Sequence, residues 1–209
     1  MLRNWFQQSI YKLNKARESG AVLHIALFNR ASLFNCTFYS NIAQISGGVI
    51  TVSNTKVLVT THCIFAYNFA GYQGGAIYSQ DTTEITVHIS IVLGNVADKT
   101  GGGAFSIKSN KMTHIDRCKF LFNKANNRAG VMLIVNSAEV QIIRCKLLNN
   151  SAQSSGGAIY SENIAFIEMN SSHLKNHKSK QNGGAVFSTG SGGLHFSSST
   201  FIDNNAASG

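Results

Sequence analysis

The sequence predicts an all-β fold, a right-handed single-stranded parallel β-helix of about eight coils with three short strands in each coil. Three observations lead to this prediction: a repeat of 27 residues, the absence of proline, and apolar residues that alternate with polar ones. Proline would remove a hydrogen-bond donor from any strand that contained it, so a proline-free chain suits continuous strand pairing. Alternation with a period of two is typical of strands.

The repeat is defined first by glycine. The second glycine of each Gly-Gly pair, or a single glycine in its place, recurs at spacings of 27 or 28 residues, at Gly20, Gly48, Gly75, Gly103, Gly130, Gly157 and Gly184. A second column with this spacing contains Asn14, Asn41, Asn68, Asn95, Asn123, Asn150 and Asn204, and His177 replaces one asparagine. Registers that hold over the whole chain indicate a repeat architecture.

Each repeat is expected to form one strand after Gly-Gly, one like residues 84–87 and one like residues 63–68. Stacking places equivalent residues about 4.8 Å apart, so apolar columns become continuous rows inside the solenoid. The asparagines are expected to form a ladder at a turn, because asparagine tolerates left-handed backbone angles and stacked amides hydrogen-bond between coils. Paired glycines are expected where φ is positive or a Cβ would clash. Parallel crossovers strongly prefer the right hand.

Residues 1–209 are predicted to form a single repeat domain, and both ends fall inside the repeat pattern. We therefore expect the domain to be a fragment of a longer array. Its coils begin near residues 19, 47, 74, 102, 129, 156 and 183, after a partial coil at 1–18. An amphipathic capping helix is the alternative for the first 19 residues, through the apolar positions Leu2, Trp5, Phe6, Ile10 and Leu13.

All four cysteines fall in one column, which contains Cys36, Cys63, Cys118 and Cys145. Because serine occupies this column in other coils, we expect inward and free thiols. Disulfides between neighbouring members, Cys36 with Cys63 and Cys118 with Cys145, are the alternative. The rung spacing lies within the ~4.4–6.8 Å that disulfides need between Cα atoms, but parallel stacking gives poor sulfur geometry.

The net charge of +9 indicates attraction to anionic partners such as acidic glycans, anionic lipid or nucleic acid, or else it serves solubility alone. Arg117, Lys119, Arg144 and Lys146 repeat one coil apart around inward cysteines. Like charges stacked in this way repel, so we expect a contact site for an anionic glycan or phosphate, with a solvated basic patch as the alternative. Nucleic acid is not expected, because no aromatic residues interleave with these positions.

No catalytic residue, metal site or cofactor is predicted. Polysaccharide lyases and hydrolases need clustered carboxylates, whereas no two of the nine acidic residues share a register on adjacent coils. The histidines are scattered over registers, and His177 is expected only to replace an asparagine in the turn column. The longest apolar stretches, such as 131–135, are far shorter than the ~20 residues that span a bilayer, so membrane insertion is not expected. Residues 1–8 lack the apolar core of a secretory signal.

Two tetrapeptides alternate along the chain. Gly-Gly-Ala-Ile stands intact at 74–77 and 156–159, and Phe-x-x-Asn stands intact at 38–41, 65–68, 120–123 and 201–204. This alternation resembles the repeat of chlamydial polymorphic outer membrane proteins. The resemblance implies a pectin-lyase-like β-helix, often the passenger of an autotransporter, that acts as a cell-surface adhesin.

Several expectations follow from this resemblance. It implies an extracellular or cell-surface location, with an association to the outer membrane, and a non-catalytic structural or adhesive role. The implied partner is a glycan or protein surface of a host cell or the extracellular space, besides the adjacent coils of the same chain. The alternative function is that of a polysaccharide-binding or polysaccharide-degrading enzyme, because many β-helices are such enzymes.

Overall fold

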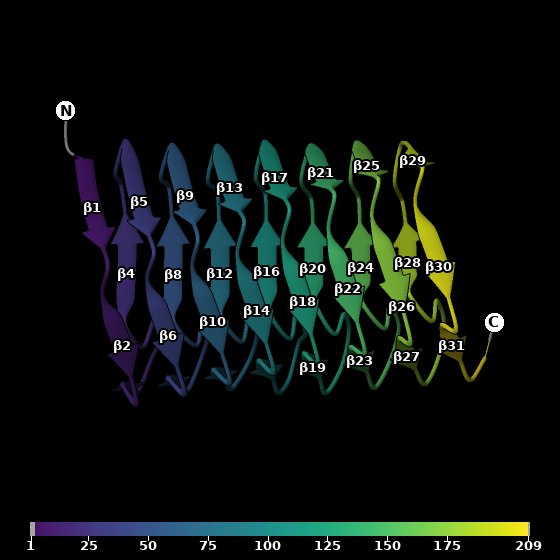
Figure 1. Cartoon of the computed structure of the whole chain (residues 1–209), viewed down its shortest axis with the longest axis horizontal. Helices are drawn as coiled ribbons and strands as arrows, with labels where there is room; N and C mark the ends of the chain where they lie inside the picture. Colours follow the sequence, from purple (N-terminus) through teal and green to yellow (C-terminus); the bar gives the residue numbers. More distant parts are fainter. Residues whose placement is uncertain (1–2, 209) are drawn as a thin grey trace.

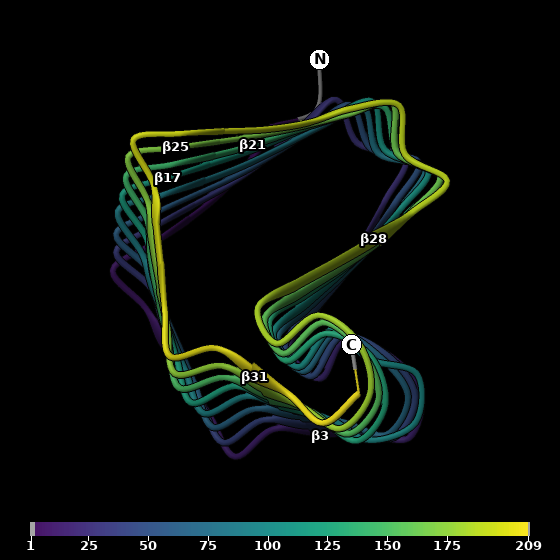
Figure 2. The same cartoon turned by 90° about the vertical axis from the view of Figure 1, so that its right-hand side faces the viewer.

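The computed structural model describes residues 3–208 and contains only strands, turns and bends within this range. The strands stack into four parallel sheets that run along the whole solenoid (Figure 1). Seen from its C-terminal end, the chain winds anticlockwise as it approaches the viewer, so the solenoid is right-handed (Figure 2). The predicted fold class is therefore confirmed.

Two of the four sheets, which we call sheets A and B, follow one another in each coil. Sheet A contains β1 (Arg3–Gln7), β5 (Arg30–Phe34), β9 (Val57–Thr61), β13 (Glu84–His88), β17 (Met112–Asp116), β21 (Glu139–Ile143), β25 (Phe166–Asn170) and β29 (Leu194–Ser197). Sheet B contains β2 (Ile10–Lys12), β6 (Thr37–Tyr39), β10 (Ile64–Ala66), β14 (Ile91–Leu93), β18 (Lys119–Leu121), β22 (Lys146–Leu148), β26 (His173–Lys175) and β30 (Thr200–Ile202).

The other two sheets, C and D, complete each coil. Sheet C contains β3 (Lys15–Ala16), β7 (Ile42–Ala43), β11 (Phe69–Ala70), β15 (Val96–Ala97), β19 (Lys124–Ala125), β23 (Ser151–Ala152), β27 (Lys178–Ser179) and β31 (Asn205–Ala206). Sheet D contains β4 (Leu23–Ala26), β8 (Ile50–Ser53), β12 (Ile77–Gln80), β16 (Phe105–Lys108), β20 (Met132–Val135), β24 (Ile159–Glu162) and β28 (Val186–Thr189). The chain makes about seven full turns, and the partial first coil brings the number to about eight.

The expectation of three strands in each coil is wrong, because the coils contain a fourth strand in sheet C. This strand has only two residues, as in Phe69–Ala70, which pairs with Ile42–Ala43 on one side and Val96–Ala97 on the other. Two residues are too few to show an alternating pattern, so the sequence gives no period from which the strand can be recognised.

The interior is filled by stacked columns of equivalent residues. Phe38 and Phe65 lie one above the other with their ring centroids 5.0 Å apart and their planes 11° from parallel, and both are fully buried. Phe105 from sheet D meets the ring of Phe120 edge-on at 5.4 Å. The aromatic column from sheet B and the column from sheet D therefore meet in the centre of the solenoid.

Each coil turns at four corners, and a residue at each corner has a positive φ. In one coil these residues are Asp81 (+52°), Ile89 (+44°), Gly94 (+61°) and Gly102 (+66°). The left-handed region is unfavourable for residues with a Cβ. Coil-to-coil hydrogen bonds offset this cost: the backbone N–H of Ile89, for example, donates to the carbonyl of Asp116 at 3.0 Å.

Glycine is required at the two positions of each pair for different structural reasons, and both reasons match the expectation. Gly74, the first of its pair, has a φ of +64°. A Cβ on Gly75, the second of that pair, would lie 2.1 Å from the carbonyl oxygen of Gly103 on the next coil. The backbones of neighbouring coils therefore leave no room for a Cβ at Gly75. The expectation for Gly20 is wrong: it has a φ of +66° and aligns with Gly47, the first glycine of its pair, so Ala21 takes the second position in the first coil.

The N-terminal residues form a coil and not the alternative capping helix. Arg3–Gln7 is a strand that pairs in parallel with β5, and Trp5 and Ile10 are exposed. Of the apolar positions considered for the helix, Leu2 lies outside the described residues. The chain thus follows the repeat from the first described residue.

Candidate functional site

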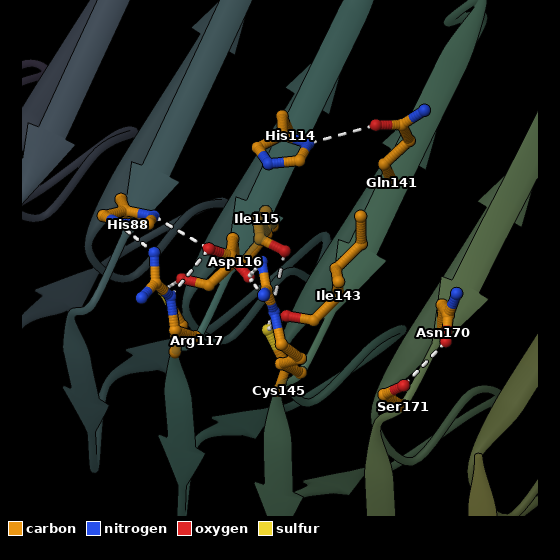
Figure 3. A network of polar contacts seen from close by, with 12 residues as sticks. His88, His114, Ile115, Asp116, Arg117, Gln141, Ile143, Cys145, Asn170 and Ser171 are labelled. Carbon is orange, nitrogen blue, oxygen red and sulfur yellow. Dashed lines mark hydrogen bonds and ion pairs between the residues drawn. The ribbon is translucent and has the colours of Figure 1, made fainter. Parts of the chain in front are cut away.

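A buried carboxylate, that of Asp116, lies at the centre of a cluster of charged side chains (Figure 3). Asp116 is the last residue of β17, and its side chain is only 4% exposed. His88 is its register partner on the preceding coil. Arg117 and Arg144 occupy equivalent corners on successive coils, each with a φ of +52°. We call these four residues the Asp116 cluster.

Both carboxylate oxygens of Asp116 accept hydrogen bonds from arginine. Arg117 Nε lies 2.9 Å from Oδ2, while Arg144 Nε and Nη2 lie 2.9 Å and 2.8 Å from Oδ1. The imidazole of His88 completes the cluster, with its Nδ1 3.0 Å from Oδ2 and its Nε2 2.8 Å from Arg117 Nη2. The contacts therefore join β13 and β17 of sheet A to the corner residues Arg117 and Arg144.

The cluster holds Asp116 charged and His88 neutral. Burial on its own raises the pKa of Asp116, but hydrogen bonds from Arg117 and Arg144 outweigh it, so the pKa lies below its ordinary value. Burial and the nearby Arg117 lower the pKa of His88, against the opposite effect of Asp116. Neutral His88 then donates from Nδ1 to Asp116 and accepts from Arg117 at Nε2, so both ring nitrogens are engaged.

The Asp116 carboxylate lies between Arg117 and Arg144 and neutralises one of their two positive charges, so the repulsion expected between them is reduced. The expected stacking of Lys119 on Lys146 agrees with the structure, while the anionic contact site at these residues stays a prediction. The two residues are register partners in sheet B and both are exposed. Within the described residues, neither forms an ion pair.

Sequence reasoning missed Asp116 because it compared acidic residues only with other acidic residues. The signal was present in the repeat. Asp116 follows its register partner His88 by 28 residues, and Arg144 comes directly after Ile143, the register partner of Asp116 on the next coil. A comparison of the positions of acidic residues with those of basic residues on adjacent coils would have identified the cluster.

The asparagine column forms a hydrogen-bonded ladder at the corner between sheets B and C. Asn68 illustrates the pattern, because its backbone N–H and its Nδ2 both donate to Oδ1 of Asn95, at 3.0 Å and 2.9 Å. Its second Nδ2 hydrogen goes to the carbonyl of Phe38 at 3.2 Å. The positive φ expected of the asparagine belongs instead to the residue before it, as in Tyr67 at +56°.

The ladder extends from Asn14 to Asn150 with the same pair of bonds between successive coils, through Asn41, Asn68, Asn95 and Asn123. His177 occupies the next position, as expected, and is followed by Asn204, whose Oδ1 accepts from the backbone N–H of His177. The His177 side chain accepts one bond at Nδ1 and leaves Nε2 buried without a partner. The ladder is therefore weakest at this coil.

The cysteine column lies inside the solenoid, at the corner between sheets A and B. Cys36, Cys63, Cys118 and Cys145 are all buried and unbonded to one another, in agreement with the expected free thiols. Burial raises the pKa of Cys63 to about 11. Contact with the Cys145 thiol, together with burial, raises the pKa of Cys118. Because the thiolate is the reactive form, Cys63 and Cys118 are poor nucleophiles in the folded protein.

Two further findings concern sites of other kinds. Among residues 3–208, no group of three or more histidine, cysteine or acidic side chains is arranged to hold a metal ion. The same part of the chain contains no helix with the length and apolar character needed to cross a membrane.

Comparison with known proteins gives one informative match. Residues 62–80 and 145–162 match the family model described as the Chlamydia polymorphic membrane protein repeat. Both segments run from sheet B through sheet C to sheet D, so they are the same part of two different coils. The resemblance seen in the tetrapeptides is confirmed at these segments. The search of curated proteins found no match, and the search of solved structures found none either.

Proposed function

We propose that this chain is a non-catalytic, adhesive module of a surface-exposed repeat protein. The repeat match and the β-solenoid together fit a surface repeat protein. The observation that carries the proposal is the continuous stacking of equivalent residues through every coil, which fills the interior and leaves long outer faces. A solenoid of this kind offers an extended surface suited to a macromolecular ligand.

The chemistry of the Asp116 cluster supports a non-catalytic role. A general acid or base needs a free position from which it can reach a substrate proton. Both oxygens of Asp116 and both ring nitrogens of His88 are already engaged by side chains of the cluster. The cluster therefore supplies cohesion between coils.

The outer surface supplies contact residues of the kind found in binding interfaces. Tyr39, Tyr67 and Phe122 are 45%, 52% and 59% exposed, although aromatic side chains usually lie buried. Aromatic residues contribute large apolar areas at interfaces at low entropic cost. They lie along the edge where sheets B and C meet, on the same side of the solenoid.

The proposal is tested by the adhesion of protein-coated beads to cultured animal cells. We expect the folded protein to retain beads on cells above the level of beads coated with heat-unfolded protein. Equal retention of folded and unfolded coatings would contradict the adhesive role. The release of reducing ends from acidic polysaccharides by the purified protein would instead establish the enzymatic alternative.

The proposed location is tested separately in the source organism. We expect an antibody against this segment to label intact cells, and external protease to remove that label. Labelling that appears only after the cells are made permeable would contradict surface exposure.

A further inference from the structure

Charge is divided between the sheets. No strand of sheet B or sheet C contains an acidic residue. The same strands contain lysines, namely Lys12, Lys119, Lys146 and Lys175 in sheet B and Lys15, Lys124 and Lys178 in sheet C. The acidic residues found in strands belong to the other two sheets: Glu84, Asp116, Glu139 and Glu168 in sheet A, and Glu162 in sheet D. The strands of sheets B and C therefore carry only basic charge, although Asp98 and Asp203 lie in turns beside them.

A shallow groove of about 570 Å³ lies over sheet C, in the C-terminal coils. Lys124, Lys178 and Lys180 line it, together with the polar residues Ser151, Gln153 and Asn205. The lining contains no acidic residue. All three lysines are exposed, and none forms an ion pair within residues 3–208. Arg117 and Arg144 share the carboxylate of Asp116, whereas these lysines have no acidic partner in that part of the chain.

The spacing of the lysines suits a ligand whose charges are sparse and regular. Lys124 and Lys178 stand in the same column with Ser151 between them, so they are two coils apart. Two coils correspond to about 9.6 Å, which is close to the length of one disaccharide in an extended polysaccharide. A nucleic acid strand carries one phosphate per ~3.4 Å, a much denser series of charges.

A second hollow, of about 410 Å³, adjoins the groove and shares Ser151 and Lys178 with it. It lies at the corner between sheets B and C and is lined by the amides of Asn149 and Asn176, with Asp203 at its end. Amide side chains donate and accept hydrogen bonds, as recognition of sugar hydroxyls requires.

The same corner continues toward the N-terminus as an aromatic surface. Phe122, Gly94 and Tyr67 occupy this corner on the preceding coils. A Cβ on Gly94 would lie 2.7 Å from the ring of Tyr67, so that ring rests against the glycine backbone. Exposed aromatic rings offer apolar faces with defined geometry, on which flat sugar rings can stack.

We infer that the groove binds an acidic polysaccharide whose chain lies along the solenoid axis. Lys124 and Lys178 contact acidic groups one disaccharide apart, Lys180 strengthens the second contact, and the neighbouring amides bind hydroxyls. The inference rests on the proposed adhesive function and names the ligand class of that surface. The groove is then the main anionic contact, and not the Arg117 and Arg144 pair, whose guanidinium groups bind the Asp116 carboxylate.

The test measures binding of the purified protein to immobilised heparin and hyaluronate, with neutral dextran and a single-stranded oligodeoxynucleotide as comparison ligands. The groove variant carries Lys124→Gln, Lys178→Gln and Lys180→Gln. The matched control carries Lys56→Gln, Lys108→Gln and Lys111→Gln, which remove the same charge near sheets A and D. We expect the groove variant to bind an acidic polysaccharide at least ten-fold more weakly, and the control to change less than two-fold.

A second variant, Ser151→Glu, retains every lysine and places a carboxylate between Lys124 and Lys178. It is expected to reduce binding to a similar extent, and circular dichroism checks that both variants remain folded. Equal losses in groove and control variants, no binding of the wild-type protein to either acidic polysaccharide, or tighter binding to the oligonucleotide would each overturn the inference. Cell adhesion measured in parallel separates the two proposals, because adhesion without polysaccharide binding leaves the adhesive function in place.

Discussion

The imidazole of His177 replaces an asparagine amide in the ladder, and its Nδ1 accepts a hydrogen bond from the backbone N–H of Asn150 at 3.1 Å. An asparagine at this position would accept a second bond from Nδ2 of Asn150, as Asn150 itself does for Asn123. The His177 Nε2 instead remains buried without a partner. Burial also lowers the pKa of His177 to about 4 from its ordinary value of 6.5.

His177 is therefore predicted to make the fold sensitive to acid. Between pH 6.5 and about 4 the unfolded chain binds a proton that the folded chain excludes, so the free energy of unfolding falls as the pH falls. The full loss amounts to about 3 kcal/mol. The substitution His177→Asn should remove this loss and add about 1 kcal/mol at pH 7 by completing the ladder. Urea unfolding at pH 7 and pH 5 measures both effects, and equal pH dependence in the two proteins would contradict the prediction.

The Asp116 cluster is predicted to stabilise the solenoid through charge-assisted hydrogen bonds. Asp116→Asn leaves Arg117 and Arg144 without their carboxylate, which should cost about 2 kcal/mol of unfolding free energy at pH 7. Because the pKa of Asp116 is lowered, this contribution is present above its ordinary value of 3.8 and is lost as the pH falls through the folded pKa. The wild-type protein should therefore approach the variant in strong acid.

Exposed Glu18 provides the control for this substitution, because its side chain has no hydrogen-bond partner within the described residues. Glu18→Gln should change the unfolding free energy by less than about 0.5 kcal/mol. Thermal unfolding followed by circular dichroism distinguishes the variants. Similar stabilities for the Asp116 and Glu18 variants would show that the cluster contributes little.

The sequence predicted the stacking because several columns of residues share the same repeat length. The phenylalanine column that contains Phe38 and Phe65 and the asparagine ladder each report the same period, and the structure places both in continuous rows. The corners are different. Left-handed residues there include Ile89, Arg117 and Phe122, whose side chains give no sign of positive φ. Coil-to-coil hydrogen bonds impose that conformation, so local propensity does not reveal it.

The basic groove was missed for a related reason. Lys124 and Lys178 are two coils apart, and Lys180 belongs to a neighbouring column, so no short sequence pattern unites them. The adjacent pairs around Cys118 and Cys145 were more visible in the sequence, but the sequence did not show that Asp116 lies between their arginines. Whether a carboxylate pairs with an arginine depends on which side of the corner each residue occupies, and only the three-dimensional structure shows this.

The buried thiols are predicted to react only after unfolding. Cys63 has its pKa raised to about 11 by burial, and it is 1% exposed. At pH 8 the Cys63 thiol of the folded protein should therefore react with a thiol reagent at least a hundred-fold more slowly than a free thiol. In guanidinium chloride without reductant, all four cysteines should react. Fewer than four reactive groups in the unfolded protein would contradict free thiols and indicate disulfides.

Close backbone stacking leaves little room for a side chain at the second glycine of each pair. A Cβ on Gly75 would lie 2.1 Å from the carbonyl oxygen of Gly103 and 2.6 Å from that of Val96, and backbone atoms cannot rotate away. Gly75→Ala should therefore cost at least about 3 kcal/mol, which is the upper range for overpacking.

Gly190 provides the control. It has a positive φ, but its Cβ would meet mainly the end of the Asn163 side chain. Since Asn163 occupies the equivalent left-handed corner, Gly190→Asn should change the stability by less than about 1 kcal/mol. Urea unfolding compares the two variants, and a mild effect of Gly75→Ala would mean that the coils are not held as closely as the stacked columns require.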